Sequence, residues 1–245
     1  MADPAPLPDD VALLWGRREG NRRGPKATLT VEEIVRAAIT LADAEGLAAV
    51  SMAKVAAELG NSTMALYRHV RSKDELLLLM GDAAVAPPPD LSGMDWRTAL
   101  TTWAFAILET ISAHSWFAQL PLTGPPIGPN NLAWFDRGLL ALSDTPLAEV
   151  EKVGIVQALI TYVHGQMRLG RELERGYQED PAAFGPRYGA VLAALIDPVR
   201  FPALSRVVAD GVFDADDMFE QGMREDVQFG LDLFLDGVAA YLARR

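Results

Sequence analysis

The chain has 245 residues, half of them apolar and none of them cysteine, and a net charge of −11. Such a chain is long enough for one or two domains with a hydrophobic core, and it can form neither a disulfide nor a thiolate metal site. Its first ten residues are acidic and proline-rich, unlike a secretory leader, and no apolar run is long enough to span a bilayer. We therefore expect a soluble, cytoplasmic protein with no membrane segment.

The charge is distributed unevenly along the chain. Residues 11–80 contain 10 Lys and Arg against 8 Asp and Glu, a net charge of +2. Residues 81–245 contain 12 against 22, a net charge of −10. Because local charge is what meets a phosphate, the first third remains compatible with nucleic-acid binding, whereas the acidic remainder should weaken non-specific binding.

Residues 1–24 are expected to form a flexible arm that begins acidic and becomes basic. One interpretation of the basic part is a solvated charged tail. The other is an arm that touches the backbone or minor groove of DNA beside a major-groove helix. The basic residues up to the first predicted helix are Arg17, Arg18, Arg22, Arg23 and Lys26.

Two helices are predicted next. Thr30 and Glu33 have the spacing of a capping box, which predicts a helix that starts at Thr30 and ends at Gly46. Ser51 is a candidate N-cap for the following helix. That helix carries apolar residues at helical spacing, namely Val55, Ala56 and Leu59.

The stretch after these helices predicts a tight turn and a further helix. Gly60 can end the preceding helix in a left-handed conformation, and Asn61 or Ser62 can cap the next one through a side-chain oxygen. Leu66 and Val70 are four residues apart and are expected to face inward. This is the arrangement of a helix-turn-helix, whose second helix can lie in a DNA major groove.

The outward side of that second helix is rich in hydroxyl and cationic groups. Short polar groups can reach base edges, and hydroxyl and cationic groups can hold phosphates. The alternative is a surface helical hairpin in an all-α protein, because motif matches carry a false-positive risk. The outward residues are Thr63, Ala65, Tyr67, Arg68 and His69, followed by Arg71 and Lys73.

A second capping box, from Ser72 to Glu75, opens a helix that leads out of this domain. Three consecutive prolines then mark a linker at residues 84–93. The helix that begins at Ser72 is therefore expected to be the mechanical link between the two parts of the chain.

The remaining sequence predicts further helices and no strand. Asp95 is a candidate cap, Thr145 followed by Pro146 is a good start signal, and Asp214 is a candidate cap for the last helix. The fold class is therefore expected to be all-α. The expected helices span about residues 95–113, 131–142, 146–174 and 188–196, with the last one running from residue 214 onward.

Aromatic and thioether side chains gather on the helices after the linker. Small-molecule pockets are mostly apolar with a few polar anchors, so these residues predict a pocket that the Pro/Gly-rich loop at 121–130 closes. The alternative is that the aromatic residues fill an ordinary core. The candidate lining residues are Trp103, Ile107, Trp116, Phe117, Trp134, Tyr162 and Met167, and the candidate anchors are His114, Gln119, Gln157, His164 and Gln166.

The last helix is apolar around most of its circumference. Such a helix must be buried, and in a chain of this size the simplest burial is against a second copy, with the helix from Pro146 completing a four-helix interface. The alternative is burial within one subunit. A dimer would hold two recognition helices about 34 Å or more apart, which suits the two half-sites of a palindrome.

The sequence carries no catalytic or cofactor signature. It contains no nucleophile elbow, phosphate-binding loop or dinucleotide-binding fingerprint. His114 and His164 are scattered, and such histidines are more often packing or hydrogen-bonding residues than metal ligands. We therefore expect no enzyme activity, no cofactor and no metal site. An all-α enzyme would need clustered acid–base residues, which the sequence does not offer.

Residues Thr30–Met80 resemble the DNA-binding domain of the TetR family of bacterial repressors, most clearly in the run LYRHVRSKDELL at Leu66–Leu77. The C-terminal part resembles the tetracycline-repressor type more loosely, at Trp96–Trp116 and in the run PNNLAWFDRGLLAL. The resemblance implies a three-helix DNA-binding domain at residues 25–80 and an effector-binding and dimerisation domain at residues 94–245. It also implies a homodimeric repressor that a small, largely apolar effector releases from a palindromic double-stranded operator.

The implied mechanism is a population shift. Effector binding moves the helix that starts at Ser72, the spacing of the recognition helices changes, and DNA affinity falls. No magnesium–tetracycline ligand set maps onto the chain. The rival is a DNA-binding regulator whose C-terminal domain only dimerises or binds a protein partner.

Matching the family's recognition helix position by position implies roles for single residues. Asn61 departs from the family pattern, which has an apolar residue after the turn glycine, and this leaves the turn geometry open. The resemblance assigns base contacts to Thr63 and Met64, and phosphate contacts to Tyr67, His69 and Lys73. The full set of expected DNA-binding residues is Arg22, Arg23, Lys26, Ser51, Ala53, Ser62, Thr63, Met64, Ala65, Tyr67, Arg68, His69 and Lys73.

Overall fold

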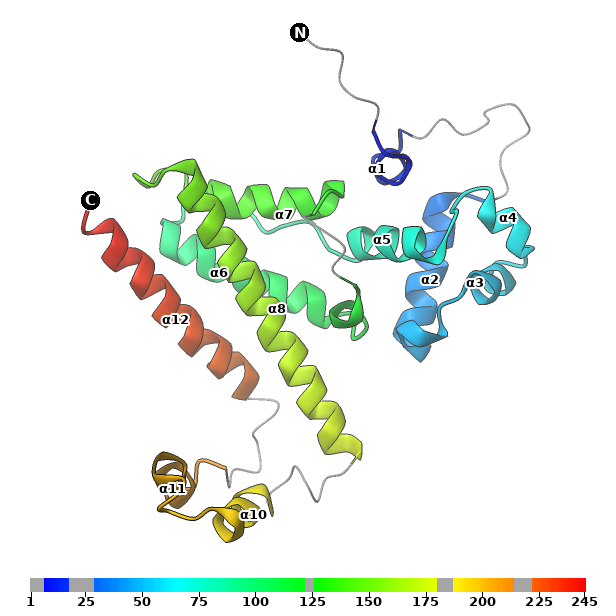
Figure 1. Ribbon diagram of the computed structural model, residues 1–245. Coiled ribbons are helices and arrows are strands. Elements are labelled where there is room, and N and C mark those ends of the chain that lie inside the picture. Colours follow the sequence, from blue (N-terminus) through cyan, green and yellow to red (C-terminus); the bar gives the residue numbers. More distant parts are fainter. Residues whose placement is uncertain (1–6, 18–28, 122–125, 180–186, 214–221) are drawn as a thin grey trace. The chain divides into compact units, whose positions relative to one another are not determined.

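The computed structural model describes residues 7–17, 29–121, 126–179, 187–213 and 222–245 (Figure 1). Every regular element in these ranges is a helix or a 3-10 turn and none is a strand, which confirms the predicted all-α class. None of the described helices is long and apolar enough to cross a membrane. The chain divides into two compact units, residues 1–157 and 158–245, and each unit is described by itself.

The first four helices after residue 29 form one bundle with a shared core, which we call the DNA-binding bundle (Figure 1). They include the predicted helix-turn-helix, and the last of them leads toward the linker. Their bounds are α2 (Val31–Glu45), α3 (Met52–Glu58), α4 (Thr63–Tyr67) and α5 (Lys73–Ala83), with a 3-10 turn, η1 (Leu47–Ala49), between α2 and α3.

Hydrogen bonds at the helix starts explain where these helices begin. The Thr30 hydroxyl accepts from the backbone N–H of Glu33, whose carboxylate accepts from the N–H of Thr30, so the first capping box is complete. The Ser72 hydroxyl accepts from the N–H of Glu75 at 3.0 Å. The Glu75 carboxylate, however, accepts from the N–H of Arg71, one residue before the expected partner. The second capping box is therefore only half formed.

The apolar faces that helical spacing predicts meet in the core of this bundle. Each fully buried Val, Leu, Ile or Met side chain contributes roughly 1.5–3 kcal/mol to the free energy of unfolding. Trp116, which lies beyond the linker, is fully buried in the same cluster. The fully buried members from α2 to α5 include Ile34, Ala38, Ala42, Val55, Leu66, Leu76 and Met80.

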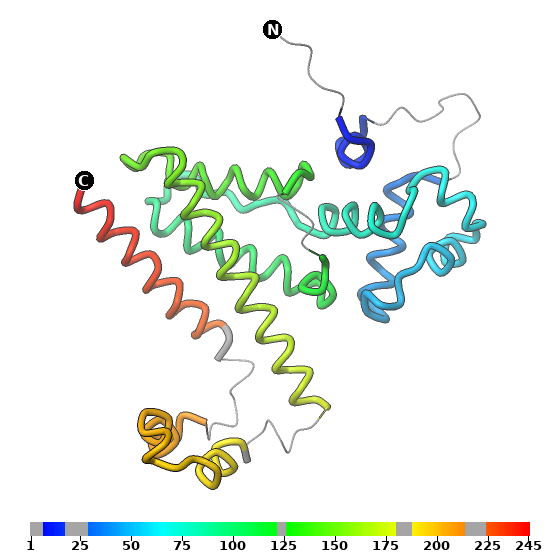
Figure 2. The backbone as a smooth tube through the Cα atoms, in the orientation of Figure 1, coloured from blue at the N-terminus to red at the C-terminus, as the bar shows by residue number. Residues whose placement is uncertain are grey.

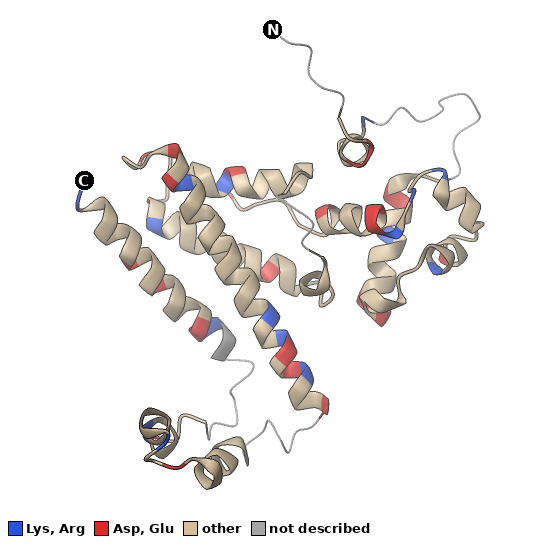
Figure 3. Cartoon of the chain, in the orientation of Figure 1, with Lys and Arg blue, Asp and Glu red and all other residues tan. Residues whose placement is uncertain are grey.

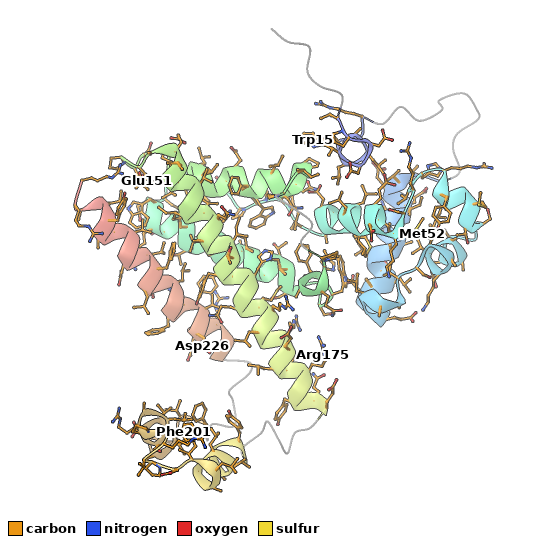
Figure 4. The ribbon with its side chains drawn as sticks, viewed as in Figure 1. Trp15, Met52, Glu151, Arg175, Phe201 and Asp226 are labelled. Atoms are coloured by element: carbon orange, nitrogen blue, oxygen red, sulfur yellow. The ribbon has the colours of Figure 1, made fainter. Side chains whose placement is uncertain are left out.

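The N-terminal part differs from the expected flexible arm. Residues Asp9–Leu14 form α1, which packs against α5 and places Leu13 and Leu14 against the core of the bundle. The indole N–H of Trp15 donates to the carbonyl oxygen of Ile127 at 2.9 Å; Figure 4 labels this tryptophan at the end of α1. The apolar residues of the segment thus anchor it to the first unit.

Beyond the linker the first unit continues with α6 (Trp96–Ser112), a 3-10 turn η2 (Phe117–Gln119) and α7 (Pro129–Leu140). Asp95 caps α6 as predicted, because its carboxylate accepts from the N–H groups of Arg97 and Thr98 at 3.0 and 3.1 Å. α7 begins two residues earlier than expected. Pro129 occupies its first position, where a missing N–H costs nothing.

The long helix α8 (Glu149–Glu179), continuous in Figure 2, begins three residues later than the Thr-Pro pair indicated. The Thr145 hydroxyl donates to the carbonyl oxygen of Leu142 at 2.7 Å, so it extends the preceding turn instead of capping α8. The Glu151 carboxylate accepts from the N–H of Ala148 at 2.7 Å and satisfies a donor at the helix start. The expected start at the proline is therefore wrong.

The second unit contains the C-terminal part of α8 with α10 (Arg187–Leu195), α11 (Pro202–Ala209) and α12 (Gly222–Leu242). Asp214, the predicted cap of the last helix, lies outside the described residues. The Tyr162 hydroxyl on α8 is shared between the carbonyl oxygens of Asp226 and Val227, at 3.1 Å each. A Cβ atom at Gly230 would lie 2.2 Å from the Tyr162 hydroxyl oxygen, so the glycine lets α8 and α12 cross closely.

Candidate DNA-binding and effector sites

The turn between α3 and α4 has the predicted geometry. Gly60 has a φ of +63°, the left-handed conformation in which glycine is least strained. Its N–H donates to the carbonyl oxygen of Ala57 at 3.0 Å, and the N–H of Asn61 donates to that of Ala56 at 2.9 Å. The side-chain amide of Asn61 also donates to the carbonyl oxygen of Leu59 at 2.7 Å. Asn61 therefore ties the turn to the end of α3 although it departs from the family pattern.

The second helix of the motif, α4, has one buried and one exposed side. Ser62 caps it through its hydroxyl. Leu66 and Val70 are fully buried, as predicted. Met64 and Tyr67 are 70% and 42% exposed. An exposed apolar and hydroxyl-bearing side next to a fixed turn suits contact with a partner molecule.

The other expected DNA-binding residues differ in accessibility. Ser51 also caps α3, because its hydroxyl accepts from the N–H of Lys54 at 3.2 Å, and Ala65 also packs against the core. Arg22, Arg23 and Lys26 lie outside the described residues. The exposed members of the set are Ser51, Ala53, Ser62, Arg68 and Lys73, and the half-buried members are Thr63, Ala65 and His69.

Basic residues, blue in Figure 3, lie on or near both helices of the motif. Lys54 on α3 pairs with Glu45, and Arg71 just after α4 pairs with Asp9 of α1. The side chains of the second pair are 61% and 64% exposed. Exposed pairs of this kind are worth about 0–1 kcal/mol, so a phosphate can replace the carboxylate at little cost.

Two of the expected effector residues, Trp103 on α6 and Trp134 on α7, are joined to each other. The Trp103 indole N–H donates to the backbone carbonyl oxygen of Trp134 at 3.0 Å. A Cβ atom at Gly138 would lie 2.7 Å from the Trp103 ring, so this glycine admits the ring between α6 and α7. Ile107, one turn further along α6, is 6% exposed. These residues form an aromatic and aliphatic layer inside the first unit.

Three other expected effector residues pack instead on the DNA-binding bundle. The Trp116 indole N–H donates to the Asp43 carboxylate of α2 at 2.7 Å, and Nδ1 of His114 lies 2.8 Å from the same oxygen. Trp116 is fully buried in the core of that bundle, and Phe117 packs against it. Sequence reasoning did not assign Asp43 a role, because its partners lie more than 70 residues away along the chain.

The remaining expected effector residues lie on α8 in the second unit. Met167 is buried, and Tyr162 and His164 are half-buried. Burial raises the pKa of Tyr162 and lowers the pKa of His164, because a less polar surrounding disfavours the charged form of each group. Both side chains are therefore neutral near pH 7 and can act as hydrogen-bonding anchors.

The described residues contain no group of three His, Asp or Glu side chains that could hold a metal ion. The described surface has one hollow between α2 and α3 and another beside the start of α12. Neither hollow is lined by the expected effector residues. The first is lined by residues that include Glu33, Arg36, Thr40 and Leu59, and the second by residues that include Arg224, Gln228 and Phe229.

Comparison with known proteins places both parts of the chain. The family model for bacterial regulatory proteins of the tetR family matches residues 23–80. The family model for the tetracyclin repressor-like C-terminal domain matches residues 88–242. The helix-turn-helix described above lies inside the first match, and the helices from α6 to α12 lie inside the second.

Individual relatives agree with these matches. The HTH-type transcriptional repressor DrrR1 of Streptomyces coeruleorubidus is 35% identical over 241 residues, which cover 96% of this chain and 86% of that protein. The structure of apo ActR from Streptomyces coelicolor is 26% identical, with a TM-score of 0.70, and covers 88% of this chain and 99% of that one. ActR in complex with (S)-DNPA is 25% identical, with a TM-score of 0.69, over 87% and 98% of the two chains.

These matches extend over nearly the whole chain and agree with the geometry of the turn and of α4. The relatives are named as transcriptional regulators and repressors, so the chain is a regulator and not an enzyme. The chain belongs to the TetR family of bacterial helix-turn-helix transcriptional repressors.

Proposed function

We propose that this repressor acts in the cytoplasm as a homodimer, binds a palindromic operator, and is released from it by a small, largely apolar effector. The observation that carries the DNA-binding part is the two-sided α4 helix. Its inner side is fully buried at Leu66, as is Val70 just after the helix, whereas its outer side presents Met64 and Tyr67 beside a turn fixed by Gly60. A rigid helix with an accessible side can enter a major groove without a change in its own domain.

The contacts proposed with DNA divide into two kinds. Met64 and Thr63 lie on the first turn of α4, where recognition helices touch base edges. Tyr67, His69 and Lys73 follow toward the start of α5, where hydroxyl and cationic groups can hold phosphates. Base contacts would determine the operator sequence, and phosphate contacts would determine the register and the salt dependence.

The proposal of a homodimer is supported by the last helix. Val227, Leu231 and Leu235 are buried on one side of α12. On the other side Phe229 and Leu233, one helical turn apart, are 68% and 59% exposed. Two apolar sides on one helix are expected when one packs within the subunit and the other packs against a partner.

The outer side of α8 has a composition that suits close helix contact. A Cβ atom at Gly154 or Gly165 would meet no atom within 4 Å, so these glycines face open space. Val150 and Leu169 on the same helix are 76% and 54% exposed. We propose that α8 and α12 of two subunits form a four-helix interface, in which the small residues let the helices approach closely.

The effector is proposed to bind in the C-terminal domain, residues 94–245. Trp103, Ile107 and Trp134 are the candidate apolar lining residues in the first unit. Met167 is the candidate lining residue in the second unit, where Tyr162 and His164 are candidate polar anchors. His114, Trp116 and Phe117 are better explained by their contacts with the DNA-binding bundle. The related protein ActR was solved with (S)-DNPA bound, which supports a small organic effector for this chain.

The first experiment selects operators from a random duplex pool at low salt and measures the mass of the free and bound protein by sedimentation. We expect an inverted repeat, and a stoichiometry of two chains for each pair of half-sites. A chain that enriches no sequence, or one that is monomeric at micromolar concentration, would contradict the proposal.

The second experiment tests the effector. The selected duplex is labelled, and its release is followed by fluorescence anisotropy. (S)-DNPA is added in one series, and a fractionated extract of the cells that express the repressor is added in another. A variant with Trp103→Ala and a variant with the exposed Val199→Ala are compared. Release that Trp103→Ala abolishes supports the pocket, whereas a repressor that no small molecule releases would favour a C-terminal domain that only dimerises or binds a protein.

A further inference from the structure

Asp82, near the end of α5, is an acidic residue that is only 5% exposed. Its carboxylate lies at the start of α7. Oδ1 accepts from the backbone N–H of Asn131 at 3.0 Å and from its side-chain amide at 2.9 Å, and Oδ2 accepts from the N–H of Asn130 at 3.3 Å. N–H groups of a first helical turn lack partners within their own helix. Asp82 thus does for α7 what an N-cap residue does, but from another helix.

The contact also runs in the opposite direction. The Asn130 side-chain amide donates to the carbonyl oxygen of Asp82 at 3.1 Å, and the Asn131 amide donates to that of Gly81 at 3.4 Å. A Cβ atom at Gly128, the residue before α7, would lie 2.1 Å from Asp82 Oδ1. The approach of the carboxylate therefore requires glycine at this position. We refer to Asp82, Gly128, Asn130 and Asn131 as the Asp82 clasp.

The other end of α5 belongs to the DNA-binding bundle. Leu76 and Met80 are fully buried in its core, and α5 packs against α2. A core of this density does not let one helix shift alone. Any displacement of the clasp along α5 must therefore move the bundle that carries α4.

A second pair of hydrogen bonds reinforces the joint. The Trp134 indole N–H on α7 donates to the carbonyl oxygen of Ala86, just after α5, at 2.6 Å. The carbonyl oxygen of Trp134 in turn accepts from the indole of Trp103 on α6. Figure 2 traces the chain from α5 through this segment to α6. The end of α5 is thus tied to the same layer in which we place the effector.

We infer that Asp82 is a positioning residue: it fuses the end of α5 to the start of α7, so that the C-terminal domain sets the position of the DNA-binding bundle through the clasp. The contacts that form the clasp stand by themselves, whereas its effect on operator binding rests on the proposed function. A buried carboxylate that loses its three hydrogen bonds is left without partners at a large cost in free energy, so the clasp stays formed.

The first test measures backbone hydrogen exchange in the full chain without DNA. Asp82→Ala should make the amides of residues 130–132 and of residues 80–83 exchange about tenfold faster, the effect of losing one cap. Asp95→Ala is the matched control, because within the described residues the Asp95 carboxylate accepts hydrogen bonds from the first turn of its own helix, at Arg97 and Thr98. It should affect only the first turn of α6. Unchanged exchange at either end of the clasp in Asp82→Ala would overturn the inference.

The second test measures operator affinity. Asp82→Ala should weaken binding about tenfold, whereas Asp95→Ala, which also loses a cap, should change it less than about twofold. A role in stability alone would lower the melting temperature of both variants and leave their affinities equal. Equal affinities would therefore overturn the inference.

The third test restores the joint by other chemistry. The double variant Asp82→Cys/Gly128→Cys has no competing thiol, since the chain contains no cysteine. A Cβ atom at Gly128 would lie 3.0 Å from the Cβ atom of Asp82, so the two must move apart by about 0.5 Å to reach the 3.5–4.5 Å that a disulfide joins. The reduced variant should bind the operator about tenfold more weakly than the parent, and oxidation should restore affinity to within about threefold.

Two results of this third test would contradict the inference. One is a pair of thiols that does not oxidise, and the other is an affinity that oxidation leaves unchanged. If the parent chain binds no duplex at all, the proposed function fails, and the exchange measurement still decides whether the clasp joins the two helices.

Discussion

The DNA-binding bundle and the last helix bury their apolar residues in different ways. In the bundle Ile34, Leu66 and Leu76 are fully buried. On α12 Leu231 and Leu235 are also fully buried, yet Leu233 between them is 59% exposed. The bundle completes its core within one chain, whereas α12 keeps a second apolar side in water.

The difference suggests that exposed apolar residues serve two kinds of contact in this molecule, one with DNA and one with another helix. On α4 they stand singly among hydroxyl and cationic groups, a mixture that suits the grooves and phosphates of DNA. On α12 Phe229 and Leu233 stand one helical turn apart on the same side and form a short stripe that suits another helix. The four predictions below break or sharpen this comparison.

The largest effect is expected from a charge on the α12 stripe. Leu233→Glu places carboxylates in the proposed interface of both subunits, and we expect a monomer whose operator affinity falls at least about 100-fold. Sedimentation velocity and fluorescence anisotropy measure the two changes. Val199→Glu is the control, because Val199 is 90% exposed and lies on neither α8 nor α12. A Leu233→Glu variant that stays dimeric would refute the assignment of the exposed side of α12 to the dimer interface.

The second effect concerns the exposed side of α4. Tyr67→Ala should weaken operator binding about tenfold, a loss in the range of 1–3 kcal/mol typical of one DNA contact, and leave the dimer intact. Tyr67→Phe separates the hydroxyl from the ring. If the hydroxyl holds a phosphate, Tyr67→Phe reproduces most of the loss. A gel shift at unchanged affinity for both variants would remove Tyr67 from the DNA contact.

A third prediction tests how much the hydrogen bond between Trp116, beyond the linker, and Asp43 stabilises the DNA-binding bundle. Asp43→Ala leaves the buried Trp116 indole N–H without its acceptor, which should lower the free energy of unfolding by about 1–3 kcal/mol. Asp43→Asn keeps an acceptor and should lose less. Thermal denaturation, followed by tryptophan fluorescence, distinguishes the two. Equal stability of Asp43→Ala and the parent would show that the hydrogen bond between Trp116 and Asp43 is not needed for this core.

The smallest effect is a pH dependence that belongs to α8. Burial lowers the pKa of His164 from its ordinary value of 6.5, so below that pH the unfolded chain binds a proton that the folded chain does not. Stability should therefore fall as the pH drops through 6.5 toward the folded pKa. His164→Gln should flatten the profile in urea denaturation. An identical profile in the variant would assign the dependence to another group.

Local features were predictable from the sequence because their hydrogen bonds close within a few residues. The capping box at Thr30, the left-handed Gly60 and the inward side of α4 all follow from short spacings. The start of α8 was missed because the Thr145 hydroxyl found a partner in the preceding turn. Two hydroxyl residues that look like equally good N-caps in the sequence can thus find different hydrogen-bond partners in the fold.

Long-range partners could not be predicted. Asp43 and Trp116 are 73 residues apart, and Asp82 and Asn131 are 49 apart. Helical and strand periodicity relate residues only a few positions apart, so neither contact can be read from the sequence. The aromatic residues near η2 were therefore assigned to the predicted effector pocket. Likewise α1 was expected to be part of a flexible arm, because the few apolar residues that dock it lie in a proline-rich, charged segment.

The salt bridge between Asp9 and Arg71 has a consequence for how binding responds to ionic strength. A cation that is already paired with a carboxylate of its own chain cannot simply gain a phosphate, because it exchanges one anion for another. The freed carboxylate then takes up a cation from solution, which offsets one of the counterions that the duplex releases. Removal of Asp9 should therefore steepen the dependence of operator affinity on salt by about one ion. Where Arg71 meets an operator phosphate, Asp9 would thus compete with that phosphate and make operator binding less sensitive to salt.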